Sequence, residues 1–167
     1  MFNVLNLKKW LDEHQDVLRP PVRNKEIYPM GEFIVMAVGG PNSRTDYHYN
    51  ETPEFFYQVK GNIVLKIVDN GVFKDIHINE GDIYLLPSRV PHSPQRPEGS
   101  VGLVIEQKRE AQHQDGFIWY CENCQAVLHE TYLQVSDIVT QLPIVLNHYK
   151  NTPELHLCKN CGHTSHK

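Results

Sequence analysis

The middle of the chain alternates short apolar runs with turn residues. Runs of four to seven apolar or alternating residues recur between positions 33 and 105, and Gly39, Gly61, Asn70 and Gly81 interrupt them. Short strands at this spacing are typical of an antiparallel sandwich or barrel. The runs that we predict as strands are 33–38, 55–59, 63–68, 72–78, 83–86 and 101–105. The pair Asn70-Gly71 predicts a tight hairpin between two of them.

Both ends of the chain have helical features instead. Asn6 is a suitable N-cap, and apolar residues follow it at helical spacing through residues 6–18. Residues 136–150 predict a second, partly helical segment, with Pro143 at a start or a kink. We therefore predict a mainly β fold with an N-terminal helix and a small C-terminal helical segment. Residues 1–110 would form the barrel with its leading helix, and residues 111–167 an extension that packs on it.

The net charge and the hydropathy of the chain argue against two classes of function, nucleic-acid binding and membrane insertion. The chain has 167 residues and a formal net charge of -4, so no broad basic surface suggests nucleic acid. It contains no run of eighteen apolar residues, and its start lacks the apolar core of a signal peptide. We expect a cytoplasmic protein that binds neither nucleic acid nor membrane.

Two histidines and one glutamate stand near the ends of predicted strands. His48 and Glu54 flank the end of one segment and the start of the next, and His92 follows Pro87 and Pro91 in a third segment. Adjacent residues of one strand cannot all face one metal, so a three-ligand site needs such separate segments. Two imidazoles and a carboxylate with open coordination positions form a typical non-haem Fe(II) site.

All four cysteines lie in the last third of the chain, as two C-x-x-C pairs. The pairs are Cys121 with Cys124 and Cys158 with Cys161. Two such knuckles present four thiolates for a tetrahedral zinc or single-iron site. Disulfides are the alternative, which a reducing compartment disfavours. Because four sulfurs leave no open position, we expect this second metal to be structural.

The ligand segments resemble the two motifs of the cupin superfamily. His48, Glu54 and Gly61 match the first motif, and Gly81, Pro87 and His92 match the second. The chain departs from the pattern at three positions, which are Asn50 in place of another histidine, Arg89 in place of a glycine and Arg96 in place of an asparagine. The resemblance implies a double-stranded β-helix, or jelly-roll barrel, with three protein ligands instead of four.

A narrower resemblance covers nearly the whole chain. Arg44 lies four residues before His48, Arg96 lies four residues after His92, Glu106 stands at a strand end, and the cysteine pairs follow. In combination these features resemble the 3-hydroxyanthranilate 3,4-dioxygenase family in its short bacterial form. The resemblance implies an Fe(II)-dependent, extradiol-type enzyme that opens the ring of 3-hydroxyanthranilate with O2 to give 2-amino-3-carboxymuconate semialdehyde. It also implies a homodimer and a role in tryptophan catabolism, on the kynurenine pathway to quinolinate and NAD.

The resemblance also implies roles for the three charged residues. A guanidinium binds a carboxylate through two bonds, so Arg96 is expected to bind the substrate's carboxylate. Glu106 is expected to bind the amino or hydroxyl group and to take its proton. Arg44 is expected to stabilise charge on O2 or to share the carboxylate.

Two other functions remain open from the residues alone. One is a different metal-dependent cupin, such as a dioxygenase or isomerase acting on a small acid. The other is a cupin sensor or binding module with a vestigial metal site. Intact His48, Glu54 and His92 argue against the binding module, and the charged residues and cysteine pairs argue against the other enzymes.

Overall fold

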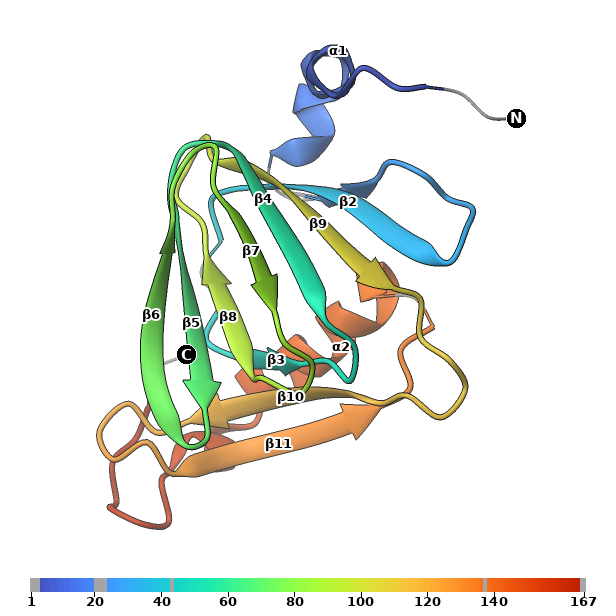
Figure 1. Ribbon diagram of the computed structural model, residues 1–167. Helices are drawn as coiled ribbons and strands as arrows, with labels where there is room; N and C mark the ends of the chain where they lie inside the picture. The colour runs from blue at the N-terminus through green and yellow to red at the C-terminus, as the bar shows by residue number, and fades with distance from the viewer. Residues whose placement is uncertain (1–3, 20–23, 43, 137, 166–167) are drawn as a thin grey trace.

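Two antiparallel sheets face each other and account for most of the regular structure (Figure 1). The computed structural model describes residues 4–19, 24–42, 44–136 and 138–165. The five-stranded sheet has the order β1 (Asn24–Glu26), β2 (Phe33–Gly39), β9 (Val101–Gln107), β4 (Glu54–Lys60) and β7 (Ile83–Leu86). The six-stranded sheet has the order β11 (Val127–Leu133), β10 (Asp115–Tyr120), β3 (Tyr47–Tyr49), β8 (His92–Gln95), β5 (Ile63–Asp69) and β6 (Val72–Ile78).

The main hydrophobic core lies between these two sheets. Alternate residues of β4 and β5 are buried, as expected for strands with one face on a core. The buried members come from both sheets and are Phe56, Ile63, Leu65, Ile67, Ile78, Leu86 and Val104. Because Leu65 is fully buried, its truncation to alanine would cost about 2–5 kcal/mol of unfolding free energy.

All six predicted strands are present, with ends that differ by no more than two residues. The predicted hairpin is confirmed, because β5 and β6 pair through Asn70 and Gly71. These two residues have φ values of 50° and 80°, the left-handed conformation that a tight hairpin turn requires. The six predicted strands do not include β1, β3, β8, β10 and β11, although His48 and His92 were expected near strand ends.

The N-terminal segment lies at one end of the barrel, beside β2 (Figure 1). It contains α1 (Leu7–Glu13) and the 3-10 helix η1 (Gln15–Leu18), and Asn6 accepts a hydrogen bond from Lys9 N at 3.0 Å as the predicted N-cap. No residue of α1 itself is buried. Leu18 is buried and approaches β2 so closely that a Cβ at Gly39 would lie 2.1 Å from Leu18 O. Gly39 therefore lets η1 pack on the sheet.

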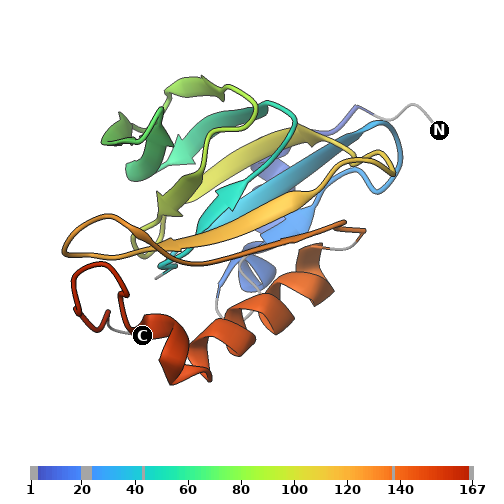
Figure 2. The ribbon, with the colours of Figure 1, turned by 90° about the horizontal axis from the view of Figure 1, so that it is seen from below.

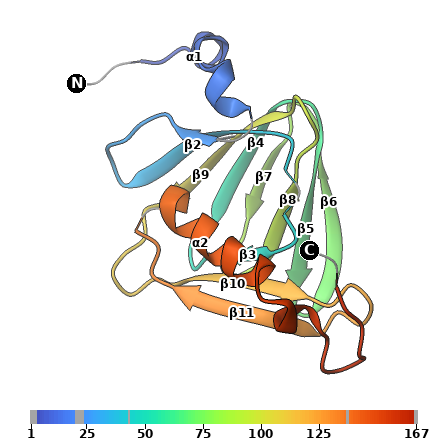
Figure 3. The same cartoon turned by 180° about the vertical axis from the view of Figure 1, so that it is seen from behind.

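The C-terminal segment builds a second, smaller core. Helix α2 (Ile138–Lys150), which contains Pro143, runs across β10 and β11 (Figures 2 and 3). Buried residues of this cluster are Phe117, Trp119, Val135 and Tyr149. The 3-10 helix η2 (Pro153–His156) then leads to the last cysteine pair. Strand β10 also pairs with β3 and so belongs to the six-stranded sheet of the barrel. The predicted division of the chain at residue 110 stays a prediction.

Candidate metal centres

His48, Glu54 and His92 meet inside the barrel. His48 lies in the middle of β3, while Glu54 and His92 begin β4 and β8. His48 and His92 are partners in neighbouring strands, whereas Glu54 comes from the opposite sheet. All three residues are buried, and one possible ligand atom from each lies within 4.8 Å of the others. A cation held here would therefore join the two sheets.

The contacts between Glu54 and His92 suit a positive ion. Glu54 Oε2 lies 3.1 Å from His92 Nε2, yet this buried oxygen has no hydrogen-bond partner among the described residues. His92 Nδ1 lies 3.1 Å from Val90 O and so carries a proton, which leaves Nε2 to face Glu54 and to offer a lone pair to a metal when this nitrogen is deprotonated. Burial alone would raise the pKa of Glu54, but the two imidazoles, His92 above all, lower this pKa to about 2. A carboxylate that stays ionised at this position is a suitable metal ligand.

Asp115 fixes the orientation of the His48 ring. His48 Nε2 lies 2.7 Å from Asp115 Oδ2, and Asp115 begins the neighbouring strand β10. Burial would raise the pKa of Asp115, but hydrogen bonds from His48 and Arg109 lower it to about 2. Histidine ligands of metals commonly bond a carboxylate through their second nitrogen. The contact therefore leaves the other ring nitrogen of His48 for a metal.

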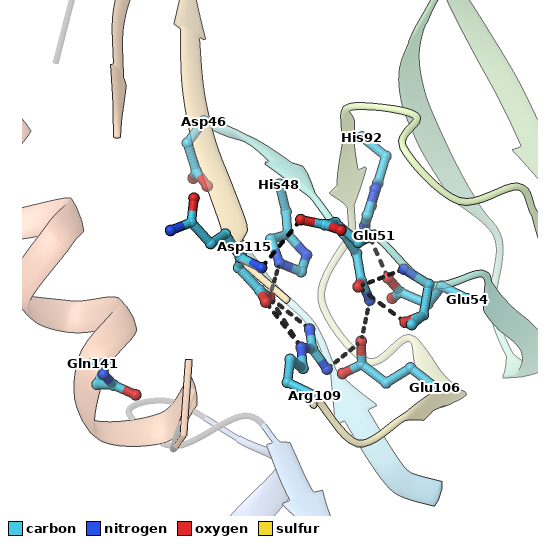
Figure 4. Close-up of polar contacts among 12 residues, drawn as sticks. Asp46, His48, Glu51, Glu54, His92, Glu106, Arg109, Asp115 and Gln141 are labelled. Atoms are coloured by element: carbon cyan, nitrogen blue, oxygen red, sulfur yellow. Dashed lines mark hydrogen bonds and ion pairs between the residues drawn. The ribbon is translucent and has the colours of Figure 1, made fainter. Parts of the chain in front are cut away.

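Arg109 and Glu106 extend this set of contacts toward the five-stranded sheet (Figure 4). Arg109 Nη1 lies 2.9 Å from Glu106 Oε2, and Arg109 Nη2 lies 2.6 Å from Asp115 Oδ2. Asn50 Nδ2 also donates to Glu106 Oε2, at 2.8 Å. Burial, followed by the charge of Glu54, raises the pKa of Glu106 to about 8 although Arg109 lowers it. Glu106 thus lies near the three candidate ligands, but its pKa is raised where that of Glu54 is lowered.

Arg96 is a buried cation without an acidic partner in the described part of the chain. Its Nη1 donates to Gln58 Oε1 at 3.3 Å, and its buried Nε has no partner there. The residue is 3% exposed, and burial lowers its pKa to about 10. An isolated buried charge is costly. The site would become more stable if an anion bound beside Arg96.

Arg44 instead has an acidic partner of its own. Its Nε donates to Asp46 Oδ1 at 2.9 Å, and its Nη2 forms an ion pair with the other oxygen of Asp46. Burial would lower the pKa of Arg44, but the charges of Asp46 and Glu54 raise it. The side chain also lines a cleft of about 400 Å³ that reaches Cys121. Its predicted part in binding O2 stays a prediction.

Sequence reasoning missed Asp115 and Arg109. Asp115 stands at the end of a polar stretch and outside every predicted strand, although it begins β10. Arg109 follows Glu106 by three residues, a spacing that indicates an ion pair in a helix and carries no such meaning after a strand. Only the pairing of β10 with β3 brings these residues to His48.

The four cysteines form a second compact cluster. Cys121 Sγ lies 3.7 Å from Cys161 Sγ, and Cys124 Sγ lies 3.5 Å from Cys158 Sγ. A disulfide requires about 2.05 Å, whereas zinc–sulfur bonds of about 2.3 Å imply tetrahedral edges of about 3.8 Å. All four cysteines are free, and their sulfur atoms lie within 4.8 Å of one another. The distances therefore favour a metal over disulfides.

Each cysteine knuckle also donates a hydrogen bond to the other. Asn123 Nδ2 donates to Cys161 Sγ at 3.6 Å, and Asn160 Nδ2 donates to Cys124 Sγ at 3.5 Å. Both asparagines directly precede the second cysteine of their own pair. Such bonds stabilise negative charge on sulfur, which suits a four-thiolate metal site.

Comparisons with known proteins agree with this geometry. Residues 1–150 match the model of the family described as 3-hydroxyanthranilic acid dioxygenase. The chain is 51% identical over 159 residues to a 3-hydroxyanthranilate 3,4-dioxygenase of Xanthomonas oryzae, covering 95% of this chain and 90% of the relative. It is 48% identical over 158 residues to the enzyme of the same name from Neurospora crassa, covering 95% and 87%.

A solved structure shows the same fold. A cupin-2 domain containing protein from Shewanella frigidimarina superposes with a TM-score of 0.50 and 19% identity, covering 64% of this chain and 95% of that protein. This likeness confirms the predicted jelly-roll architecture. In the described residues, no helix is both long enough and apolar enough to cross a bilayer.

Proposed function

The chain belongs to the 3-hydroxyanthranilic acid dioxygenase family, and from this premise we propose that it opens the ring of 3-hydroxyanthranilate with O2, using Fe(II) held by His48, Glu54 and His92. Its similarity to relatives of that name indicates that it is an enzyme, and specifically a ring-cleaving dioxygenase. The product would be 2-amino-3-carboxymuconate semialdehyde, and the reaction would lie on the kynurenine pathway to quinolinate and NAD.

The main support for this proposal is the pairing of two unsatisfied groups in one buried site. Among the described residues, Glu54 Oε2 has no hydrogen-bond donor and suits a cation, while Arg96 has no acidic partner and suits a carboxylate. A metal and an anionic substrate would satisfy both. Two imidazoles and one carboxylate fit Fe(II), because they leave positions open for substrate and O2.

The chain's own residues would bind the substrate and move its proton. When bound, Fe(II) supplies the electron density that lets O2 react with an aromatic ring. Arg96 binds the carboxylate and thereby fixes the direction of the ring. Glu106 accepts a proton from the hydroxyl or amino group. Because the charge of Glu54 raises the pKa of Glu106, a cation that offsets this charge would leave more of Glu106 ionised and able to accept the proton. Arg44 stabilises charge on O2 or shares the carboxylate.

The proposal includes a second metal and an assembly. Cys121, Cys124, Cys158 and Cys161 would hold zinc or iron in a structural role, since four thiolates leave no open position. A homodimer follows from the family resemblance. Sedimentation of the purified protein tests the dimer. A cytoplasmic location stays a prediction.

A turnover assay tests the proposed reaction. The protein is loaded anaerobically with Fe(II), and then 3-hydroxyanthranilate and air-saturated buffer are added while the ring-opened product is followed by absorbance. Anthranilate, which lacks the hydroxyl group, is the matched control and should give no product. Absence of product from 3-hydroxyanthranilate with one equivalent of iron in the barrel would contradict the proposal. Turnover of another small acid would then favour the alternative of a different cupin enzyme.

A further inference from the structure

Arg109 is the only arginine of the described chain that pairs with two buried carboxylates in different strands. Its Nη1 lies 2.9 Å from Glu106 Oε2 on β9, while its Nε and Nη2 lie 3.0 and 2.6 Å from the two oxygens of Asp115 on β10. All three side chains are at most 4% exposed. Figure 4 shows the guanidinium between the two acids. One rigid group thus connects the two sheets at the site.

We propose that Arg109 is a positioning residue, which fixes the Glu106 carboxylate relative to the His48 imidazole by binding Glu106 and Asp115 at the same time. The inference rests on the proposed function, because it assigns Glu106 to the substrate side and His48 to the metal side. Arg109 itself would contact neither the substrate nor the metal. It acts on the metal side through Asp115, which bonds His48 Nε2 at 2.7 Å.

The geometry requires an arginine at this position. The guanidinium is planar and presents donors in a fixed fork, so binding Asp115 through Nε and Nη2 leaves Nη1 directed at Glu106. A lysine would keep the positive charge but presents one flexible ammonium, which cannot bind both acids in a fixed orientation. Arg109→Lys would therefore keep the positive charge at this position and remove the fixed orientation of the two acids.

Asn50 is a second donor to the oxygen of Glu106 that Arg109 binds. Asn50 Nδ2 donates to the same oxygen of Glu106, at 2.8 Å, and Asn50 Oδ1 accepts bonds from Thr52 N and Oγ1, both at 3.0 Å. The position where many cupins have a further histidine therefore helps to orient Glu106. Arg109 and Asn50 together therefore fix the position of Glu106 Oε2.

The test compares Arg109→Lys with Arg89→Lys as a matched control. Arg89 has a 68% exposed side chain and only a 3.8 Å contact with Glu51. Loss of an outer contact to a metal ligand typically costs 10- to 100-fold in metal affinity or activity. We expect Arg109→Lys to lower kcat by about that factor and to weaken Fe(II) binding, with KM changed less than about threefold because Arg96 is intact. Fe(II) affinity is measured by chelator competition with zinc in the cysteine centre.

The possible results distinguish a role of Arg109 in orienting the two acids from a role of its charge alone. They also distinguish failure of this inference from failure of the proposed function. Wild-type kcat and Fe(II) affinity in Arg109→Lys would overturn the inference, as would a raised KM with unchanged kcat. If that variant does not fold, Asp115→Asn cuts one arm of the contact and should weaken Fe(II) binding, and unchanged binding would overturn the inference. If the wild-type protein binds Fe(II) but opens no ring, the proposed function fails, and the affinity comparison still tests the arm toward His48.

Discussion

Glu54 and Glu106 stand directly opposite each other on the neighbouring strands β4 and β9. Both carboxylates are buried, yet the pKa of Glu54 is lowered to about 2 and that of Glu106 is raised to about 8. Burial raises both pKa values, but the imidazoles of His92 and His48 outweigh it only for Glu54. Two neighbouring acids whose pKa values are moved apart in this way commonly have different roles in a reaction. Here the ionised acid suits a metal, and the other suits proton transfer.

The first prediction concerns the three barrel ligands. Replacing His48, Glu54 or His92 with alanine should abolish ring opening, because each loss leaves at most two protein ligands for the metal. His77→Ala is the matched control, since His77 is an exposed histidine on β6. Iron content and turnover are measured together. Full activity with stoichiometric iron in any one variant would remove that residue from the ligand set.

The second prediction concerns substrate binding. Arg96→Ala should weaken binding of 3-hydroxyanthranilate about ten- to a hundred-fold, the equivalent of a lost charge-assisted bond of about 1.5–3 kcal/mol. The fold should remain, because removing an unpaired buried cation also removes its desolvation cost. Anaerobic titration of the Fe(II) protein gives the dissociation constant, with exposed Arg19→Ala as control. An unchanged constant would place the carboxylate elsewhere.

The third prediction uses the raised pKa of Glu106. This acid is protonated more readily in the folded chain, at a pKa of about 8, than at its ordinary value of 4.5. Its contribution to stability is therefore fully present below about pH 4.5 and is lost as the pH rises through 8. The charged groups that face it are Glu54 on β4, Asp115 on β10 and Arg109.

Glu106→Gln removes this titration and serves as the comparison. With the barrel site free of metal, the unfolding free energy of the wild-type protein, measured relative to the variant, should fall between about pH 4.5 and 8. Denaturant melts at each pH measure the difference, and zinc kept in the cysteine centre prevents thiol titration from contributing. A constant difference across this range would show that Glu106 is ionised throughout.

The sequence predicted the elements whose pattern is local. Strands such as β4 and β5 alternate between buried and half-buried positions along most of their length, and Asn70-Gly71 specifies its own turn. Strand β3 has only three residues with a buried histidine between two tyrosines, which is too short for alternation to be recognised. The spacing of His48, Glu54 and His92 was informative because metal chemistry restricts which residues can converge.

The rest of the site depends on pairings between distant strands. Asp115 lies 67 residues from His48 in the chain, and nothing in the local pattern indicates that they bond. Arg109 reaches Asp115 only because the chain turns between β9 and β10. The partner of Arg44 was within reach of sequence reasoning, since Asp46 is two residues away, but whether substrate replaces that partner depends on the bound state.

The last prediction separates the two metal centres. On a metal, His48, Glu54 and His92 would leave coordination positions open, whereas the four cysteines would complete a tetrahedron. Replacing Cys158 and Cys161 with serine should therefore remove one metal equivalent and lower the melting temperature, because the second knuckle no longer holds the C-terminal segment against Cys121 and Cys124. The barrel site should still bind Fe(II) and turn over substrate wherever the variant remains folded. Metal analysis beside a single-turnover assay measures both effects. A folded, iron-loaded variant that has lost all chemistry would instead show that the cysteine centre takes part in electron transfer.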